Sequence, residues 1–74
     1  MTPLEIEHAV MRTGGHQGKV IRLLQDEGYT KEEIQIAITS ATKNGYVIDE
    51  GGIYALKADR IEIVRRYCIL DVIA

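Results

Sequence analysis

The stretch that most constrains the fold runs from residue 30 to residue 56 and reads TKEEIQIAITSATKNGYVIDEGGIYAL. Its first half predicts an amphipathic helix, because apolar residues recur with the spacing of one buried helical face. These residues are Ile34, Ala37, Ile38 and Ala41. Thr30 is the expected N-cap, Glu33 completes a capping box, and Asn44-Gly45 ends the helix. Because residues typical of β-strands follow this helix directly, few folds are compatible with this stretch.

Residues 46–49 and 53–56 predict the two strands of a β-hairpin. Gly51-Gly52 suits a two-residue type I′ turn, in which both central residues need a positive φ. This register pairs Val47 with Leu56 and Asp49 with Tyr54. We expect the face with Val47, Tyr54 and Leu56 to pack on the helices, since an isolated hairpin is marginal in water.

Two further helices are predicted before residue 30. The first has Thr2 as its N-cap, Pro3 at its first position and Glu5 completing a capping box, and Gly14-Gly15 ends it. The second begins near Gln17 or Gly18 and ends at Gly28. With the hairpin, these helices form one small domain, residues 1–56.

Residues 57–74 predict a C-terminal helix, ADRIEIVRRYCILDVIA from residue 58, which is apolar on nearly every side in its last turns. Such a helix needs two partners, its own domain and something else. We therefore expect a homodimerisation helix, with packing in the core of its own chain as the alternative. The residues expected at the dimer contact are Ile61, Val64, Tyr67, Cys68 and Val72.

The size and composition indicate a small globular domain. A chain of 74 residues buries only about 60% of its unfolded surface, so the core is small. The single cysteine, Cys68, cannot form an internal disulfide and fits a reducing, cytoplasmic setting. Neither a signal peptide nor a membrane span is expected, because the N-terminus carries acids and residues 61–74 are short and charged.

The charge is unevenly distributed along the chain. The net charge is −2, which argues mildly against nucleic acid as a partner. Between Glu7 and Asp26, however, there is no acidic residue, and Arg12, Lys19 and Arg22 lie in this window. A basic surface is therefore possible on an acidic protein.

The order helix, helix, capped helix, hairpin resembles the winged helix-turn-helix family of DNA-binding domains. The resemblance covers roughly residues 3–56. It is carried by Gly45-Tyr46-Val47 after the third helix and by Gly52, Tyr54 and Leu56, which match the family's Gly-x-Tyr-x-Leu spacing. It implies a mainly α fold with a small β-hairpin: three helices, a two-stranded wing and the C-terminal helix.

The resemblance also implies that the third helix is a recognition helix in the major groove of double-stranded DNA. Glutamine can pair with adenine, threonine can contact base edges or a thymine methyl, and lysine neutralises phosphate. The residues expected to contact DNA from this helix are Lys31, Gln35, Thr39, Thr42 and Lys43, and those expected at the backbone are Arg12, His16, Lys19 and Arg22.

One feature departs from DNA-binding members of the family. The expected wing tip is Asp49-Glu50, whereas DNA-reading wings tend to carry Arg or Lys. Winged helices also serve as protein-binding modules, because a fold does not determine a function. The sequence thus predicts a small dimeric transcriptional regulator that binds DNA, with a protein–protein interaction module without DNA binding as the alternative.

No catalytic or metal-binding pattern is expected. Gly15-His16-Gln17-Gly18 matches the GxxG loop of RNA-binding KH domains, but the helices on both sides favour a plain turn. His8 and His16 have no companion ligands and are expected at the surface or at a helix cap. Cys68 has no evident base partner. We expect neither an enzyme nor a cofactor.

Overall fold

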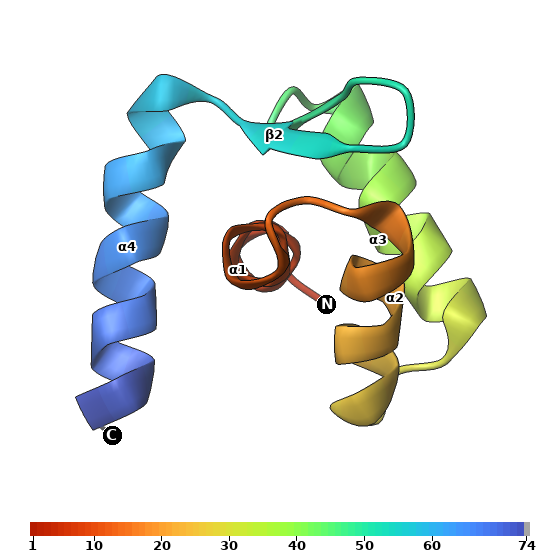
Figure 1. Cartoon of the computed structure of the whole chain (residues 1–74), viewed down its shortest axis with the longest axis horizontal. Coiled ribbons are helices and arrows are strands. Elements are labelled where there is room, and N and C mark those ends of the chain that lie inside the picture. The colour runs from red at the N-terminus through yellow and green to blue at the C-terminus, as the bar shows by residue number, and fades with distance from the viewer. Residues whose placement is uncertain (74) are drawn as a thin grey trace.

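The computed structural model describes residues 1–73 of the chain, with side chains as far as Tyr67. In chain order the elements are α1 (Pro3–Thr13), α2 (Gln17–Asp26), α3 (Lys31–Lys43), β1 (Val47–Asp49), β2 (Tyr54–Leu56) and α4 (Ala58–Ile73) (Figure 1). The expected mainly helical architecture with a small antiparallel sheet is confirmed. Among the helices described, none has the length and apolarity needed to cross a bilayer.

Capping interactions set where the helices begin and end. At the start of α3, the Thr30 hydroxyl accepts from the Glu33 amide at 3.2 Å, and the Glu33 carboxylate accepts from the Thr30 amide at 3.2 Å. At the start of α1, the Glu5 carboxylate accepts from the Thr2 amide at 3.4 Å. The capping box at Thr30 is complete, whereas at Thr2 the Glu5 carboxylate binds the amide but the Thr2 hydroxyl makes no cap hydrogen bond. Because its carboxylate is bound in the capping box, the Glu33 side chain is held in one position on the α3 surface.

The hairpin has the predicted register. Val47 pairs with Leu56 and Asp49 with Tyr54. Gly51 and Gly52 have φ values of 66° and 90°, as a type I′ turn requires. Because Val47 and Tyr54 are buried, the hairpin packs on the helices through the expected face.

The segment between α1 and α2 pairs with the hairpin, which the sequence did not predict. His16 forms an antiparallel bridge with Ile53, and the Tyr54 amide donates to the Gly15 carbonyl at 2.8 Å. The Gln17 amide donates to the Gly52 carbonyl at 3.1 Å. Any Cβ at Gly15 would collide with the Tyr54 carbonyl oxygen, so only glycine allows this approach. The start of α2 is therefore attached directly to β2.

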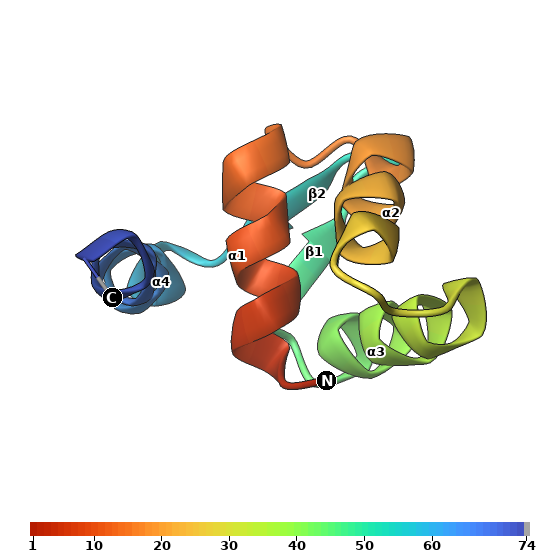
Figure 2. The same ribbon diagram turned by 90° about the horizontal axis from the view of Figure 1, so that it is seen from below.

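The core lies between α1, α2, α3 and the hairpin. Figure 2 shows α1 between α4 on one side and α2 and α3 on the other. Of the four predicted buried positions of α3, Ile34, Ile38 and Ala41 are buried, and Ala37 is half-buried against the same core. The buried core cluster is Ile6, Ala9, Val10, Val20, Leu24, Ile34, Ile38, Ala41, Val47 and Tyr54.

Helix α4 packs on α1 of its own chain. Val64 is fully buried, and the ring of Tyr67 meets the ring of His8 edge-on, with centroids 5.5 Å apart. His8 is only 8% exposed, so its expected surface position is wrong. The reason is that α4 covers the side of α1 that the helical spacing alone left open to solvent.

A buried ion pair joins α4 to α1. Glu7 is 0% exposed, and Arg60 binds its carboxylate with two hydrogen bonds, Nε to Oε2 at 2.8 Å and Nη2 to Oε1 at 2.7 Å. The guanidinium carbon of Arg60 also lies 4.8 Å from the ring centroid of Tyr46, which follows α3. Arg60 thus connects three parts of the chain through a bidentate ion pair and a cation–π contact.

Replacing Arg60 by methionine should lower the free energy of unfolding by about 3–5 kcal/mol, because Glu7 would remain buried without its partner. The measurement is urea unfolding followed by circular dichroism. The double variant Glu7→Met/Arg60→Met should regain most of this loss, since an apolar pair of similar volume needs no counter-charge. The control is Arg65→Met, at an exposed position of α4. If Arg60→Met were as stable as this control, the ion pair would not be important for stability.

Candidate nucleic-acid interface

The outer face of α3 carries the predicted DNA-contacting residues. Lys31, Gln35, Thr39 and Lys43 are all exposed and follow one another at intervals of four residues. This spacing places them in one slowly winding row along the helix, which we call the α3 row. The structure therefore brings four of the five predicted residues of this helix together.

Thr42, the fifth, differs from the other four. It is half-buried, and its hydroxyl donates to the carbonyl oxygens of Ile38 at 3.0 Å and Thr39 at 2.9 Å. A hydroxyl that bonds to its own helix in this way is engaged locally. Sequence spacing had placed Thr42 with the α3 row, but it could not show this internal bonding.

The expected backbone-contacting cations are all exposed. Arg12 lies in the last turn of α1, and Lys19 and Arg22 lie on the first two turns of α2. In the part of the chain that the structure describes, none of the three is paired with a carboxylate. His16 is exposed at the N-cap position of α2. These charges are free to meet an anionic partner.

Acidic residues limit the positive surface. Glu32 is exposed in the first turn of α3, and Asp49 and Glu50 are exposed at the hairpin tip. The Asp49 carboxylate accepts from the Gly52 amide at 3.0 Å, so it also holds the turn. The acids lie at the start of α3 and at the hairpin tip, whereas the middle of α3 carries none.

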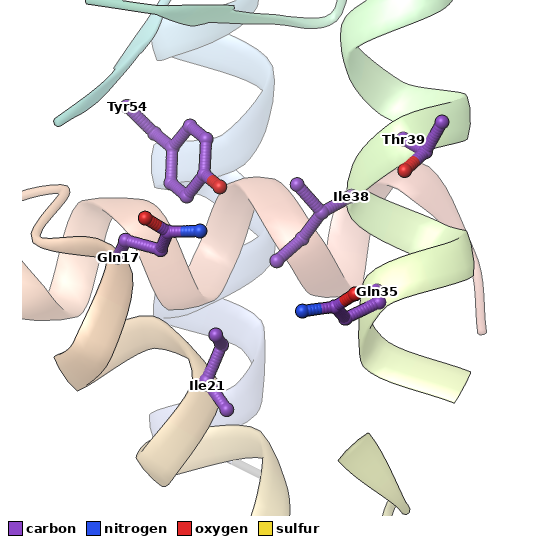
Figure 3. Close-up of a pocket in the computed structure, with 6 residues that line it drawn as sticks. All are labelled: Gln17, Ile21, Gln35, Ile38, Thr39 and Tyr54. Atoms are coloured by element: carbon purple, nitrogen blue, oxygen red, sulfur yellow. The ribbon is translucent and has the colours of Figure 1, made fainter. Parts of the chain in front are cut away.

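A small hollow opens between α2, α3 and β2, and the sequence did not predict it (Figure 3). Its volume is about 130 Å³. Figure 3 shows the side-chain amides of Gln17 and Gln35 and the hydroxyl of Tyr54 turned toward one central space. The lining residues are Gln17, Ile21, Gln35, Ile38, Thr39 and Tyr54. Gln35 and Thr39 belong both to this hollow and to the outer surface of α3, so the two are continuous.

Tyr54 contributes a hydroxyl group without a partner to this hollow. The residue is only 5% exposed, but its hydroxyl reaches solvent and makes no hydrogen bond to any residue that the structure describes. Burial raises the pKa of Tyr54, and the charge of Asp49 raises it further. The phenol therefore remains protonated and can donate a hydrogen bond.

A second hollow, of about 210 Å³, lies between α1, the end of α2 and α4. Here the Tyr29 hydroxyl donates to Glu5 at 3.0 Å, and this hydrogen bond is the main reason that the pKa of Tyr29 is raised. Glu27, His8 and Tyr67 complete the lining. Within the described residues, no three side chains of the metal-binding types come together.

The predicted dimer contacts of α4 fall into three groups. Val64 and Tyr67 face α1 within the chain, and Ile61 is half-buried. The side chains of Cys68 and Val72 lie outside the described part. Ile63, which was not among the predicted contacts, is 46% exposed. The exposed apolar surface of α4 in the described part is therefore centred on Ile63.

Comparison with known proteins adds no relative: no protein family model, no curated protein and no solved structure matches the chain.

The raised pKa of Tyr54 predicts a loss of stability at high pH. Because the folded-state pKa lies above the ordinary value of 10.0, the stabilisation is complete below that pH and is lost as the pH rises through the folded-state pKa. Between about pH 9 and pH 11, the free energy of unfolding in urea should fall less steeply for Tyr54→Phe than for the unaltered chain. Equal slopes in the two proteins would contradict the raised pKa of Tyr54. The decline that remains in Tyr54→Phe includes the contribution of Tyr29, whose pKa is also raised.

Proposed function

We propose that the chain is a winged helix DNA-binding protein, a transcriptional regulator in which α3 is the recognition helix. The observation that carries the proposal is the α3 row, which is exposed along the whole helix. Helix α3 itself lies on the side of the molecule away from α4 (Figures 1 and 2). The residue types of the α3 row are those that read base edges and bind phosphates.

The arrangement of α2 beside α3 supports this docking. In a helix-turn-helix the recognition helix enters the major groove while the helix before it crosses the sugar–phosphate backbone. Here that preceding helix is α2, which carries the exposed and unpaired cations Lys19 and Arg22. In this docking the cations of α2 neutralise phosphates, and α3 supplies the base contacts.

The centre of α3 suggests a preference for A·T pairs. Gln35 can bond to adenine through two hydrogen bonds, and Thr39 can contact a base edge or a thymine methyl. Ile36, adjacent to them, is 71% exposed and can pack on the same methyl group. Base discrimination would then come from this part of the helix.

We also propose that the protein acts as a homodimer through α4. In the described part, α4 packs on α1 with one face and leaves Ile63 in solvent on another. The sequence continues as CILDVI, in which five of the six residues are apolar. Two copies would present two α3 helices, as two-fold symmetric operators require.

A protein-interaction module is the second candidate, and a different observation favours it. Ile36 on α3 and Ile48 and Ile53 on the hairpin are exposed large apolar residues, and the hairpin tip is acidic. Apolar contact surrounded by polar residues is typical of protein interfaces. This candidate predicts a protein partner and no salt-sensitive binding to DNA.

DNA binding can be tested by titrating the chain with duplexes of mixed random sequence at about 50 mM and about 200 mM salt. We expect the affinity to fall steeply with salt, because each phosphate contact contributes about −0.9 to the slope of log affinity against log salt. Lys31→Ala and Arg22→Ala should each make the slope shallower by roughly that amount. Arg65→Ala, on α4, is the control and should leave the slope unchanged. No binding at low salt would favour the protein-interaction module.

Dimerisation can be tested at one residue. Sedimentation equilibrium at tens of micromolar should show a dimer for the unaltered chain and a monomer for Ile63→Glu, which would place a charge in the proposed interface. The matched control is Ile48→Glu, at a position of β1 that is similarly exposed, 45% against 46%. A monomeric unaltered chain would refute the dimer and leave DNA binding open.

A further inference from the structure

The hollow between α2, α3 and β2 contains groups that the fold itself does not use. The ring of Tyr54 is buried, with the residue 5% exposed, but its hydroxyl reaches solvent at the hollow and makes no hydrogen bond to any residue that the structure describes. A hydroxyl held there by a buried ring can bind a ligand without breaking a hydrogen bond of the fold. The amides of Gln17 and Gln35 face the same space (Figure 3). The Tyr54 hydroxyl and the two side-chain amides, each with a hydrogen-bond donor, therefore line one opening beside α3.

The position of the hollow relates it to the proposed DNA-binding surface. Gln35 and Thr39 form part of both the hollow and the outer surface of α3. Gln17 is the first residue of α2, the helix that crosses the DNA backbone in the proposed docking. A DNA strand that borders the groove occupied by α3 would pass over this opening.

The donors suit a phosphate oxygen. About half to two thirds of the hydrogen bonds between proteins and DNA go to phosphate and sugar, and tyrosine, glutamine and the N-termini of helices are among their sources. The first turn of α2 has no acidic residue, and nothing would contact a Cβ at Gly18, so a backbone can approach it closely. The nearest acid, Asp49, has one carboxylate oxygen engaged by the Gly52 amide.

We infer that this hollow is a subsite for one phosphodiester of bound DNA, whose oxygen accepts hydrogen bonds from the Tyr54 hydroxyl and the side-chain amide of Gln17, while Gln35 at the rim stays available for a base edge. The inference rests on the proposed DNA binding. It adds a contact made entirely by uncharged donors, which fixes the register of α2 on the backbone without releasing counterions.

Tyr54→Phe tests the subsite because it removes only the donor. With duplexes of mixed random sequence, its affinity should be about threefold to tenfold weaker than that of the unaltered chain at both low and moderate salt, the loss of one such hydrogen bond. The slope of log affinity against log salt should stay the same, since no cation is removed. Tyr46→Phe, a half-buried tyrosine that does not line the hollow, is the matched control and should bind normally. Normal binding by Tyr54→Phe would overturn the subsite and leave the proposed function intact.

Stability of the free protein provides a second measurement. Tyr54→Phe should unfold in urea at neutral pH with a midpoint equal to or above that of the unaltered chain, because the hydroxyl makes no hydrogen bond to the residues that the structure describes. A clearly lower midpoint would show that the hydroxyl serves the fold and would overturn the inference.

The phosphate itself can be located on a duplex enriched from the random pool. Each phosphate is replaced in turn by a neutral methylphosphonate. We expect one position at which the replacement weakens binding of the unaltered chain clearly more than binding of Tyr54→Phe, in which the hydroxyl contact is already absent. If Tyr54→Phe loses affinity and no such position exists, the hydroxyl contacts a base and the subsite is wrong. If the unaltered chain binds no duplex at all, the subsite and the proposed function fail together, and a protein partner becomes the alternative to pursue.

Discussion

The ion pair between Glu7 and Arg60 is the interaction on which the arrangement of the whole chain depends. A fully buried carboxylate is tolerable only when a counter-charge and hydrogen bonds replace its water. Arg60 provides both, and it also stacks on Tyr46 at the end of α3. The pair therefore holds α4 on α1 in one orientation, and it keeps α4 on the side of α1 away from α3 (Figure 2). An apolar contact alone would allow α4 to slide or rotate, since such contacts are not directional.

Local chemistry made most of the fold predictable. The capping boxes at Thr2 and Thr30 and the glycines at residues 14, 28 and 45 marked the helix boundaries, and Gly51-Gly52 determined the hairpin register. These signals act over a few residues, so they can be read directly from the chain. The pairing of residues 15–17 with β2 was missed because its partners are almost forty residues apart and its signal is a single glycine. Glu7 was missed for a similar reason: its partner is 53 residues away.

The candidate site, like the fold, has features that the sequence predicts and features that it does not. The α3 row was predictable, because helical spacing determines which residues share a face. Helical spacing does not show whether a polar side chain on that face is already hydrogen-bonded within the protein. Thr42 is an example, because its hydroxyl bonds to its own helix. The hollow could not have been predicted, since it requires α2, α3 and β2 to meet at known positions. Tyr54 was expected only as a core residue, and its ring is indeed buried. Its hydroxyl, however, lies at the boundary between the core and the α3 surface.

The distance along the chain between Glu7 and Arg60 also has a consequence for synthesis. Translation produces α1 first, and the residue that neutralises Glu7 is made only after all three core helices and the hairpin. A nascent chain that ends at Leu56 has every element of the core but must keep Glu7 in water, which holds one side of α1 away from its final environment. Only when α4 has been synthesised can Glu7 be buried and α1 take its final position. The protein should consequently fold as one cooperative unit rather than as a domain to which a helix is later added.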